Sequence, residues 1–336
     1  MKIAILSPVA WRTPPRHYGP WEQIASNVAE GLVEKGVDVS LFATLDSETG
    51  GKLEGVISRG YEEDREVDPK VAECLHISNL MEKSGRFDLI HNHFDFLPLT
   101  YSGLIKTPMV TTIHGFSSPK ILPVYKKYNS SNFYVSISNS DRQPSLTYVA
   151  TVYNGIDENR FTLQLEPENY LLFFGRIHPD KGTWEAIQIA KKAKRKLIIA
   201  GIIQDQEYFT KKVHPFINDE DIIYTGPYGP AERDTLLGRA HALLHPINFE
   251  EPFGMSVAES MFCGTPVIAF HRGSMPELIQ DGRTGFLVSD IDEAVERLGD
   301  LSDISRQDCR EWAAGRFSRR KMVADYLDVY SSILGP

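Results

Sequence analysis

Two glutamates in the stretch from Phe249 to Phe270 are the residues of this chain best placed to do chemistry. Glu251 and Glu259 stand eight positions apart. Pro252 suits the first position of a helix, where its missing N–H would have no partner anyway, so we expect a helix to begin there. Glu251 would then lie at the helix N-terminus, which favours anions, with Glu259 roughly 12 Å further along the axis. That separation matches the sugar and the ribose of a nucleotide diphosphate sugar, with the diphosphate between them.

A second candidate for binding an anion follows the apolar run Tyr170–Phe174. The segment Gly175–Gly182, GRIHPDKG, carries Arg176 and Lys181 on a predicted strand-to-helix loop. Arginine offers a planar fork and lysine a point charge, and both suit phosphate. Pro, Asp and Gly in this segment are also ordinary turn residues, so a solvated loop stands as the alternative. For the two glutamates the alternative is a solvated helix face.

Three histidines and an aspartate form a further group. His114 follows the predicted strand Met109–Ile113, although a lone histidine is more often structural. His91 and His93 are two positions apart, hence on one face of a strand, and with His114 nearby they could ligate a metal; Asp95 follows them in the sequence. We disfavour that interpretation because neither a fourth ligand nor outer partners can be identified from the sequence.

Short apolar runs alternate with amphipathic helices from end to end, which is typical of parallel sheets covered on both faces. Strands are predicted in the first half at Lys2–Ser7, Val37–Phe42, Asp88–His91, Met109–Ile113, Phe133–Ser136 and Val149–Tyr153. Strands are predicted in the second half at Tyr170–Phe174, Lys196–Ala200, Ile222–Tyr224, Ala242–His245, Pro266–Ala269 and Gly285–Val288. The pattern predicts an α/β fold of two doubly wound, Rossmann-like halves whose strand ends face a common central cleft, where open sheets bind ligands.

The boundaries of these halves follow from composition. We expect a first domain over residues 1–157, a linker over 158–168 that is rich in Glu and Pro, and a second domain over 169–318. The final helix, Arg319–Leu334, has apolar residues on one side; these are Met322, Val323, Tyr326, Val329, Tyr330 and Ile333.

The loop after the first strand, Pro8–Glu22, has no G-x-G-x-x-G pattern, which counts against a nicotinamide enzyme. Polar and aromatic residues in it could bind an acceptor molecule by charge and ring contacts; they are Arg12, Arg16, His17, Tyr18 and Trp21. For Trp21 we favour a different position, as the first core residue of the helix that follows. Gly36 is well placed to end that helix.

Composition excludes several classes of protein. The 336 residues carry a formal charge of −9, so no affinity for nucleic acid is implied. The three scattered cysteines favour reduced thiols and a cytoplasmic protein. No apolar run approaches the ~20 residues of a membrane span, and the N-terminus is a poor signal peptide. Residues 96–140 contain lysines but no Asp or Glu; a solvated face is favoured there over weak contact with a membrane surface or an anionic acceptor.

The stretch EPFG…E…CGTPVIA, followed by RGSMPE and DGRTGFLV, resembles the Glu-x7-Glu signature of retaining glycosyltransferases of family four. The resemblance covers nearly the whole chain and implies the GT-B fold, in which the final helix 319–336 packs on the first domain. It implies that Glu251 and His114 contact the transferred sugar and Glu259 the ribose. It further implies that Arg176 and Lys181 hold the diphosphate and offset the charge of the leaving group.

The same resemblance carries over further donor-binding residues, which are Gly19, Phe253, Gly254 and Met255. The family usually has two adjacent glycines at the first of these positions, whereas this chain has Pro20 after Gly19. That departure removes one N–H donor and restricts the backbone.

The implied reaction is transfer of a hexosyl unit from a nucleotide diphosphate sugar to an acceptor hydroxyl, with retention at the anomeric carbon, no cofactor and no metal. The alternatives are a nucleotide-sugar epimerase of the same fold and a binding protein without turnover. The exposed Asp219–Asp221 segment (DED) is read as a surface turn rather than a metal-binding Asp-x-Asp. The base, the sugar, the acceptor and the oligomeric state do not follow from the sequence.

Overall fold

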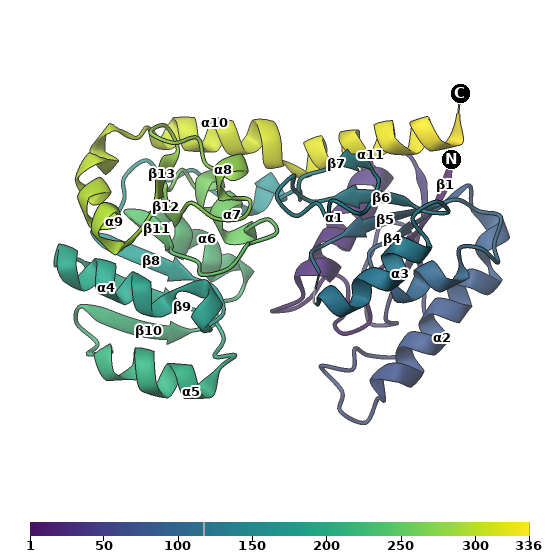
Figure 1. Cartoon of the computed structure of the whole chain (residues 1–336), viewed down its shortest axis with the longest axis horizontal. Helices are drawn as coiled ribbons and strands as arrows, with labels where there is room; N and C mark the ends of the chain where they lie inside the picture. Colours follow the sequence, from purple (N-terminus) through teal and green to yellow (C-terminus); the bar gives the residue numbers. More distant parts are fainter. Residues whose placement is uncertain (117, 336) are drawn as a thin grey trace. The chain divides into compact units, whose positions relative to one another are not determined.

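The computed structural model describes residues 1–116 and 118–335. The chain forms two compact units, and each is described by itself (Figure 1). The first unit comprises Met1–Gly155 and Arg319–Pro336, and the second comprises Ile156–Ser318. Within the described residues, no helix combines the length and the apolar character needed to cross a bilayer.

The first unit is built on a parallel sheet of seven strands in the order β3-β2-β1-β4-β5-β6-β7. Its strands are β1 (Lys2–Leu6), β2 (Asp38–Phe42), β3 (Lys52–Glu54), β4 (Leu89–Asn92), β5 (Met109–Ile113), β6 (Phe133–Ser136) and β7 (Tyr148–Thr151). The central strands β1, β4 and β5 are almost wholly buried, because a parallel sheet needs helices on both faces. The short edge strand β3 was not predicted from the sequence; it is only partly buried and has little apolar pattern.

Two pairs of helices cover this sheet. They are α1 (Pro20–Glu34) with α11 (Arg319–Leu334), and α2 (Pro69–Glu82) with α3 (Leu122–Lys127). The apolar side predicted for the final helix is the side that packs on the first unit, and α11 lies against α1. The two helices approach so closely that a Cβ on Gly31 would come within 2.4 Å of Val323.

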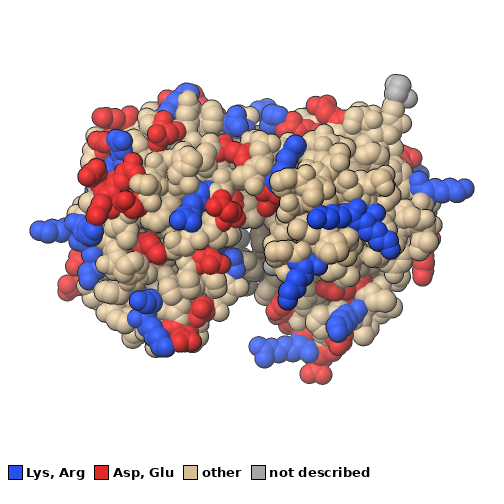
Figure 2. Space-filling view, viewed as in Figure 1, with Lys and Arg blue, Asp and Glu red and all other residues tan. Residues whose placement is uncertain are grey.

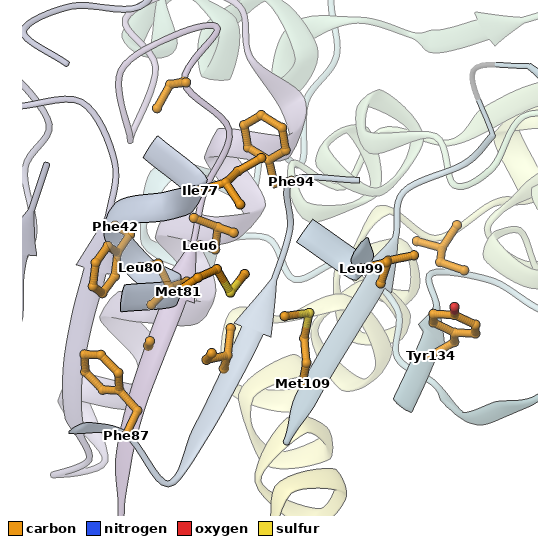
Figure 3. Close-up of a cluster of buried hydrophobic side chains, with 14 of the residues drawn as sticks. Leu6, Phe42, Ile77, Leu80, Met81, Phe87, Phe94, Leu99, Met109 and Tyr134 are labelled. Atoms are coloured by element: carbon orange, nitrogen blue, oxygen red, sulfur yellow. The ribbon is translucent and has the colours of Figure 1, made fainter. Parts of the chain in front are cut away.

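The core on the α2 face of the sheet joins strand and helix residues. Figure 3 shows Leu6 of β1 and Phe42 of β2 together with Leu80 and Met81 of α2, and Phe87 lies in the same cluster. Each of these side chains is no more than 8% exposed, so the cluster removes nearly all of their apolar surface from water. This packing fixes the strands and thereby the loops that leave their carboxyl ends.

The second unit contains a parallel sheet of six strands in the order β10-β9-β8-β11-β12-β13. Its strands are β8 (Tyr170–Phe174), β9 (Lys196–Ala200), β10 (Ile222–Gly226), β11 (Ala242–His245), β12 (Val267–Phe270) and β13 (Gly285–Val288). Its helices are α4 (Thr183–Ala193), α5 (Gln206–Tyr208), α6 (Pro230–Arg239), α7 (Met255–Phe262), α8 (Met275–Leu278), α9 (Ile291–Arg297) and α10 (Arg306–Phe317). The strand order in which β8 lies between β9 and β11 creates a reversal point, where open α/β sheets bind ligands.

The segment 158–168, which we expected to link the two domains, makes contacts within the second unit. Phe161 is buried, and Arg310 of α10 donates to the carbonyl oxygens of Phe161 and Glu158. The backbone N–H of Gln164 also donates to the carbonyl of Cys263. The composition of the segment did not reveal these hydrogen bonds, because within the segment they use backbone atoms that every residue has.

Candidate active site

The loop that carries Glu251 differs from the expectation. The helix does not begin at Pro252: α7 begins at Met255, and Gly254 before it has a φ of 93°. This left-handed conformation costs glycine little, and a Cβ on Gly254 would also come within 2.8 Å of the Met275 side chain. Glu251 therefore lies in the loop before the helix, and Glu259 is only about one turn inside it. The separation of ~12 Å along one helix axis does not apply.

A turn at residues 272–274 holds this loop in place. The N–H of Ser274 donates to the Glu251 carbonyl at 3.0 Å, and the Ser274 hydroxyl donates to the Phe253 carbonyl at 2.6 Å. The N–H of Gly273 donates to the Glu250 carboxylate at 2.6 Å. The RGSMPE stretch that follows the glutamates thus has a structural task, because its turn anchors the backbone on both sides of Pro252.

Lys181 and Glu251, which are 70 positions apart in the chain, form an ion pair. Lys181 belongs to a short 3-10 helix, Pro179–Lys181, that follows β8. Its ammonium group also lies 4.7 Å from the centre of the Phe249 ring. Both charged side chains are largely buried, with 14% and 11% of their surface exposed. Such a pair is costly to break by removing one partner, because a buried charge is then left uncompensated.

His245, at the end of β11, adds to this group and was not predicted from the sequence. Its Nε2 atom lies 3.6 Å from the same Glu251 oxygen that Lys181 contacts, and it has no hydrogen-bond partner among the described residues. Burial raises the pKa of the Glu251 carboxyl, but contacts with His245 and Lys181 outweigh burial and lower that pKa to about 2. Glu251 is therefore an anion at any ordinary pH. Only its place at the end of a strand, before Pro246, could have pointed to His245.

Glu259 is paired as well, with a residue that the sequence did not reveal. Arg233 of α6 donates to a Glu259 carboxylate oxygen at 2.8 Å, and its guanidinium lies 5.4 Å from the centre of the Phe174 ring. The Glu259 side chain is only 7% exposed. Burial raises the pKa of its carboxyl despite the arginine. The second unit therefore holds both glutamates beside cations.

Arg176 lies on the loop after β8 and is half-buried. Its guanidinium donates to the side-chain oxygen of Gln204, which follows β9. Near the start of α7, the backbone N–H groups of Gly254 and Met255 find no acceptor within the described ranges 1–116 and 118–335. Free N–H groups at a helix start, with the Lys181 ammonium held at Glu251 in the preceding loop, are the ingredients of an anion site.

In the first unit, His114 lies just beyond β5 and is 9% exposed. Its Nε2 atom is 2.9 Å from Nδ1 of His93. The ring of Trp21 stacks on it, with ring centres 5.6 Å apart and planes at 21°. Trp21 is only half-buried, and so is not the core residue that we expected. The stacking contact joins residues 93 positions apart, which no local pattern reveals.

The other side chains of the histidine group have partners that turn them away from a shared metal. His91 bonds through Nδ1 to Tyr330 and through Nε2 to Thr112, at 2.6 and 2.7 Å. The Asp95 carboxylate accepts from the Tyr125 hydroxyl. Across residues 1–116 and 118–335, no cluster of three or more His, Cys, Asp or Glu side chains is arranged to hold a metal ion.

The loop that carries Gly19 is fixed by ion pairs. Arg12 contacts Glu48 at 3.0 Å, and Arg16 contacts Asp46 and Glu63 at 3.3 and 3.0 Å. These arginines are therefore already engaged with carboxylates. Gly19 has a φ of 149°, and Pro20 occupies the first turn of α1, where the lost N–H costs little.

Asp219–Asp221 forms an exposed turn, as expected. The backbone N–H groups of Glu220, Asp221 and Ile222 all donate to the side chain of Asn218. Among the described residues, the carboxylates of this segment belong to no group of three or more side chains that could hold a metal ion. This arrangement is that of a surface loop leading into β10.

The sequence matches two models of known protein families. The family model Glycosyltransferase Family 4 matches residues 22–160, and Glycosyl transferases group 1 matches residues 155–316. An uncharacterized 41.2 kDa protein from the cps region of Klebsiella pneumoniae is 27% identical over 292 residues, which are 74% of this chain and 80% of that protein. The trehalose synthase of Pyrococcus horikoshii is 30% identical over 190 residues, and the match spans 46% of that protein.

Among solved structures, HepE of Anabaena in complex with UDP-glucose has a TM-score of 0.72 at 19% identity, with 99% of this chain and 100% of that chain covered. At this identity the likeness establishes the fold alone. Together the two family models span the chain from residue 22 to residue 316. Both models describe glycosyltransferases, and the chain has the GT-B fold. It is a glycosyltransferase.

Proposed function

We propose that this glycosyltransferase moves a hexosyl unit from a nucleotide diphosphate sugar to an acceptor hydroxyl, with retention at the anomeric carbon. The observation that carries the proposal is the group of Lys181, Glu251 and His245 beside the start of α7. A cation, a permanent carboxylate and free N–H groups suit a ligand with both hydroxyls and an anionic leaving group. The solved complexes of HepE with UDP-glucose, and with UDP and glucose, support a donor of this class.

For the second unit we propose specific tasks. Arg176, Lys181 and the backbone N–H groups around Phe253, Gly254 and Met255 stabilise the diphosphate as it departs, because donors aimed at developing charge lower the barrier. Glu251 accepts hydrogen bonds from hydroxyls of the sugar. Glu259 accepts a hydrogen bond from a ribose hydroxyl through its carboxylate, which Arg233 holds in place by donating a hydrogen bond to it.

For the first unit we propose that His114 contacts the transferred sugar and that Gly19 lies against the donor. The buried histidine is uncharged, because burial lowers its pKa to about 3. It therefore serves as a hydrogen-bonding group and not as a cation. The unit as a whole is assigned to the acceptor side, and the second unit to the donor.

The proposed chemistry needs no separate protein nucleophile. The acceptor attacks the face that the leaving group vacates, and the departing diphosphate takes the acceptor proton. Glu251 is held by Lys181 in an ion pair, which suits a residue that orients hydroxyls better than one that forms a covalent bond. Incubation with a UDP-sugar in the absence of acceptor separates this reaction from epimerisation: a new nucleotide sugar would identify an epimerase.

The acceptor is a hydroxyl compound, and its surroundings in the first unit are basic. Lys106, Lys120, Lys126 and Lys127 are exposed in the acid-free segment, and Figure 2 shows Lys and Arg side chains over the region where Figure 1 draws α3. We propose weak contact of this face with an anionic acceptor or membrane surface. Three free thiols, on Cys74, Cys263 and Cys309, agree with a cytoplasmic location.

A panel of UDP-, GDP- and ADP-sugars in a thermal-shift assay tests the donor class. A donor present at a hundred times its Kd raises the free energy of unfolding by about 2.7 kcal/mol. The sugar of the correct nucleotide should therefore raise the melting temperature more than the others do. Turnover with that donor should persist in EDTA, because the proposed site meets the diphosphate with protein cations instead of a metal. Loss of activity in EDTA that magnesium or manganese restores would contradict metal-independent transfer.

A further inference from the structure

His93, which the proposed reaction does not use, is the direct hydrogen-bond partner of His114. The two rings meet through His93 Nδ1 and His114 Nε2 at 2.9 Å. Burial lowers the pKa of both imidazoles far below the ordinary value, so both rings are neutral. Two neutral imidazoles that share one hydrogen bond have a single proton between the two contacting nitrogens. The proton is either on His93 or on His114.

The far nitrogen of His93 decides between these arrangements. His93 is 0% exposed, and its Nε2 atom has no partner among the described residues. If His114 donated, His93 would carry its proton on Nε2, as a buried N–H without an acceptor. If His93 donates from Nδ1, its Nε2 is a bare lone pair. Buried N–H groups without a partner are rarer than unused acceptors, so His93 donates. His114 then carries its own proton on Nδ1.

Neighbouring rings pack against both histidines and restrict their rotation. His91 packs on His93 with ring centres 4.1 Å apart, and Trp21 stacks on the other histidine. His91 is itself clamped at both nitrogens, by Tyr330 of α11 and by Thr112. Thr112 in turn bonds Tyr326 of the same helix at 2.7 Å. The C-terminal helix thus completes a layer of hydrogen bonds behind the two rings.

We propose that His93 is a positioning residue that holds His114 as the Nδ1-protonated tautomer, so that His114 offers an N–H donor to a ligand oxygen. This inference rests on the proposed contact between His114 and the sugar. It predicts that the partner atom on the ligand is a hydrogen-bond acceptor, such as a hydroxyl lone pair. A group that can only donate would be rejected, because it would face an N–H and leave a buried polar group unpaired.

The first test reads the tautomer and needs no variant. In protein labelled with ¹⁵N-histidine, the two ring nitrogens of each imidazole have distinct chemical shifts in their protonated and bare forms. We expect His114 to be protonated on Nδ1 and bare on Nε2, with His93 also protonated on Nδ1. Protonation of His114 on Nε2 in the folded protein would overturn the inference, whatever the activity.

The second test uses a matched pair of variants. In His93→Asn the amide N–H can take the place of the Nδ1 donor, whereas His93→Leu fills the space without one. Because a single hydrogen bond contributes modestly, we expect kcat to fall about two- to tenfold in the leucine variant and to stay within about twofold of wild type in the asparagine variant. Equal losses in two variants of equal thermal stability would contradict a positioning role.

A double-mutant cycle separates this inference from the proposed function. If His93 acts through His114, then His93→Leu should cost nothing further in a His114→Ala background. Additive losses would show that His93 acts independently. Full activity in His114→Ala alone would contradict the proposed contact between His114 and the sugar. The tautomer of His114 would still be tested independently, by the measurement on the wild-type protein.

Discussion

Two buried glutamates show how differently the two units treat charge. Glu22 in the first unit is 2% exposed, and Glu251 in the second is 9% exposed. Burial raises the pKa of Glu22 to about 7, because none of the described residues brings a cation to its carboxyl to outweigh the loss of solvation. Burial acts on Glu251 in the same direction, but His245 and Lys181 bring its pKa down to about 2. Between Glu22 and Glu251, the charged partners and not the depth of burial therefore make the difference.

The difference extends to the candidate residues around each glutamate. In the second unit, Lys181 and Arg233 neutralise carboxylates. In the first unit, His93 and His114 meet as neutral rings. In the proposed reaction, fixed charge suits the residues assigned to the departing diphosphate, and a fixed donor direction suits the residue assigned to sugar hydroxyls.

The largest effect is expected from removing the cation of the second unit. Lys181→Ala should lower turnover about a hundredfold or more, in line with the loss of one charge contact to a transition state. Lys192→Ala is the matched control, because Lys192 forms an exposed ion pair with Asp292 and exposed pairs contribute little. Steady-state kinetics on both variants, with thermal unfolding measured in parallel, checks the comparison. Turnover near wild type in Lys181→Ala would contradict the proposed charge contact.

Ionisation of Glu22 should lower the free energy of unfolding of the first unit as pH rises. A carboxyl with a raised pKa is most stabilising below about pH 4.5, and this stability is lost as pH rises through about 7. The shift corresponds to roughly 3 kcal/mol at about 1.4 kcal/mol per pKa unit. Glu22→Gln should abolish this dependence, and Glu62→Gln, an exposed neighbour, should not. Hydrogen exchange of α1 at several pH values measures the local opening free energy in the wild type and in Glu22→Gln. If the difference between the two proteins does not change with pH, the prediction is wrong.

Replacing the carboxylate of the second unit by an amide should have a somewhat smaller effect on turnover. Glu251→Gln keeps the shape of the side chain but removes charge-assisted hydrogen bonds, which are worth about 1.5–3 kcal/mol. We expect kcat to fall about ten- to a hundredfold, with nucleotide affinity little changed. Glu296→Gln, at an exposed position of α9, is the control. Wild-type turnover in Glu251→Gln would end the assignment of this residue to the sugar.

The smallest change is expected at Glu259. Glu259→Ala should weaken binding of free UDP or GDP about tenfold, which is about 1.4 kcal/mol, because the proposed ribose contact is lost. Isothermal titration calorimetry measures this affinity without any sugar present. Glu296→Ala, on an exposed face of α9, should bind nucleotide as the wild type does. If Glu259→Ala does the same, Glu259 serves the structure through Arg233 and not the ligand.

Much of the fold could be predicted from the sequence, because it depends on local pattern. The bounds of the final helix, Arg319–Leu334, and of the strands Tyr170–Phe174 and Met109–Ile113 agree with the structure, since apolar periodicity directly reflects which face is buried. The start of α7 was misplaced by three residues. Proline permits a helix start but does not require one, and the left-handed Gly254 is what delays it.

The sequence by itself determined the alternation of strands and helices, the two-unit α/β architecture and the residue types that can meet sugar and phosphate. Only the tertiary structure decided which of these residues are partners: Lys181 with Glu251, Arg233 with Glu259, and His93 with His114. Such pairs join the ends of strands and helices far apart in the chain. The spacing of residues along one strand or helix carries no information about which side chain another element brings to it, and that depends on the order of strands in the sheet.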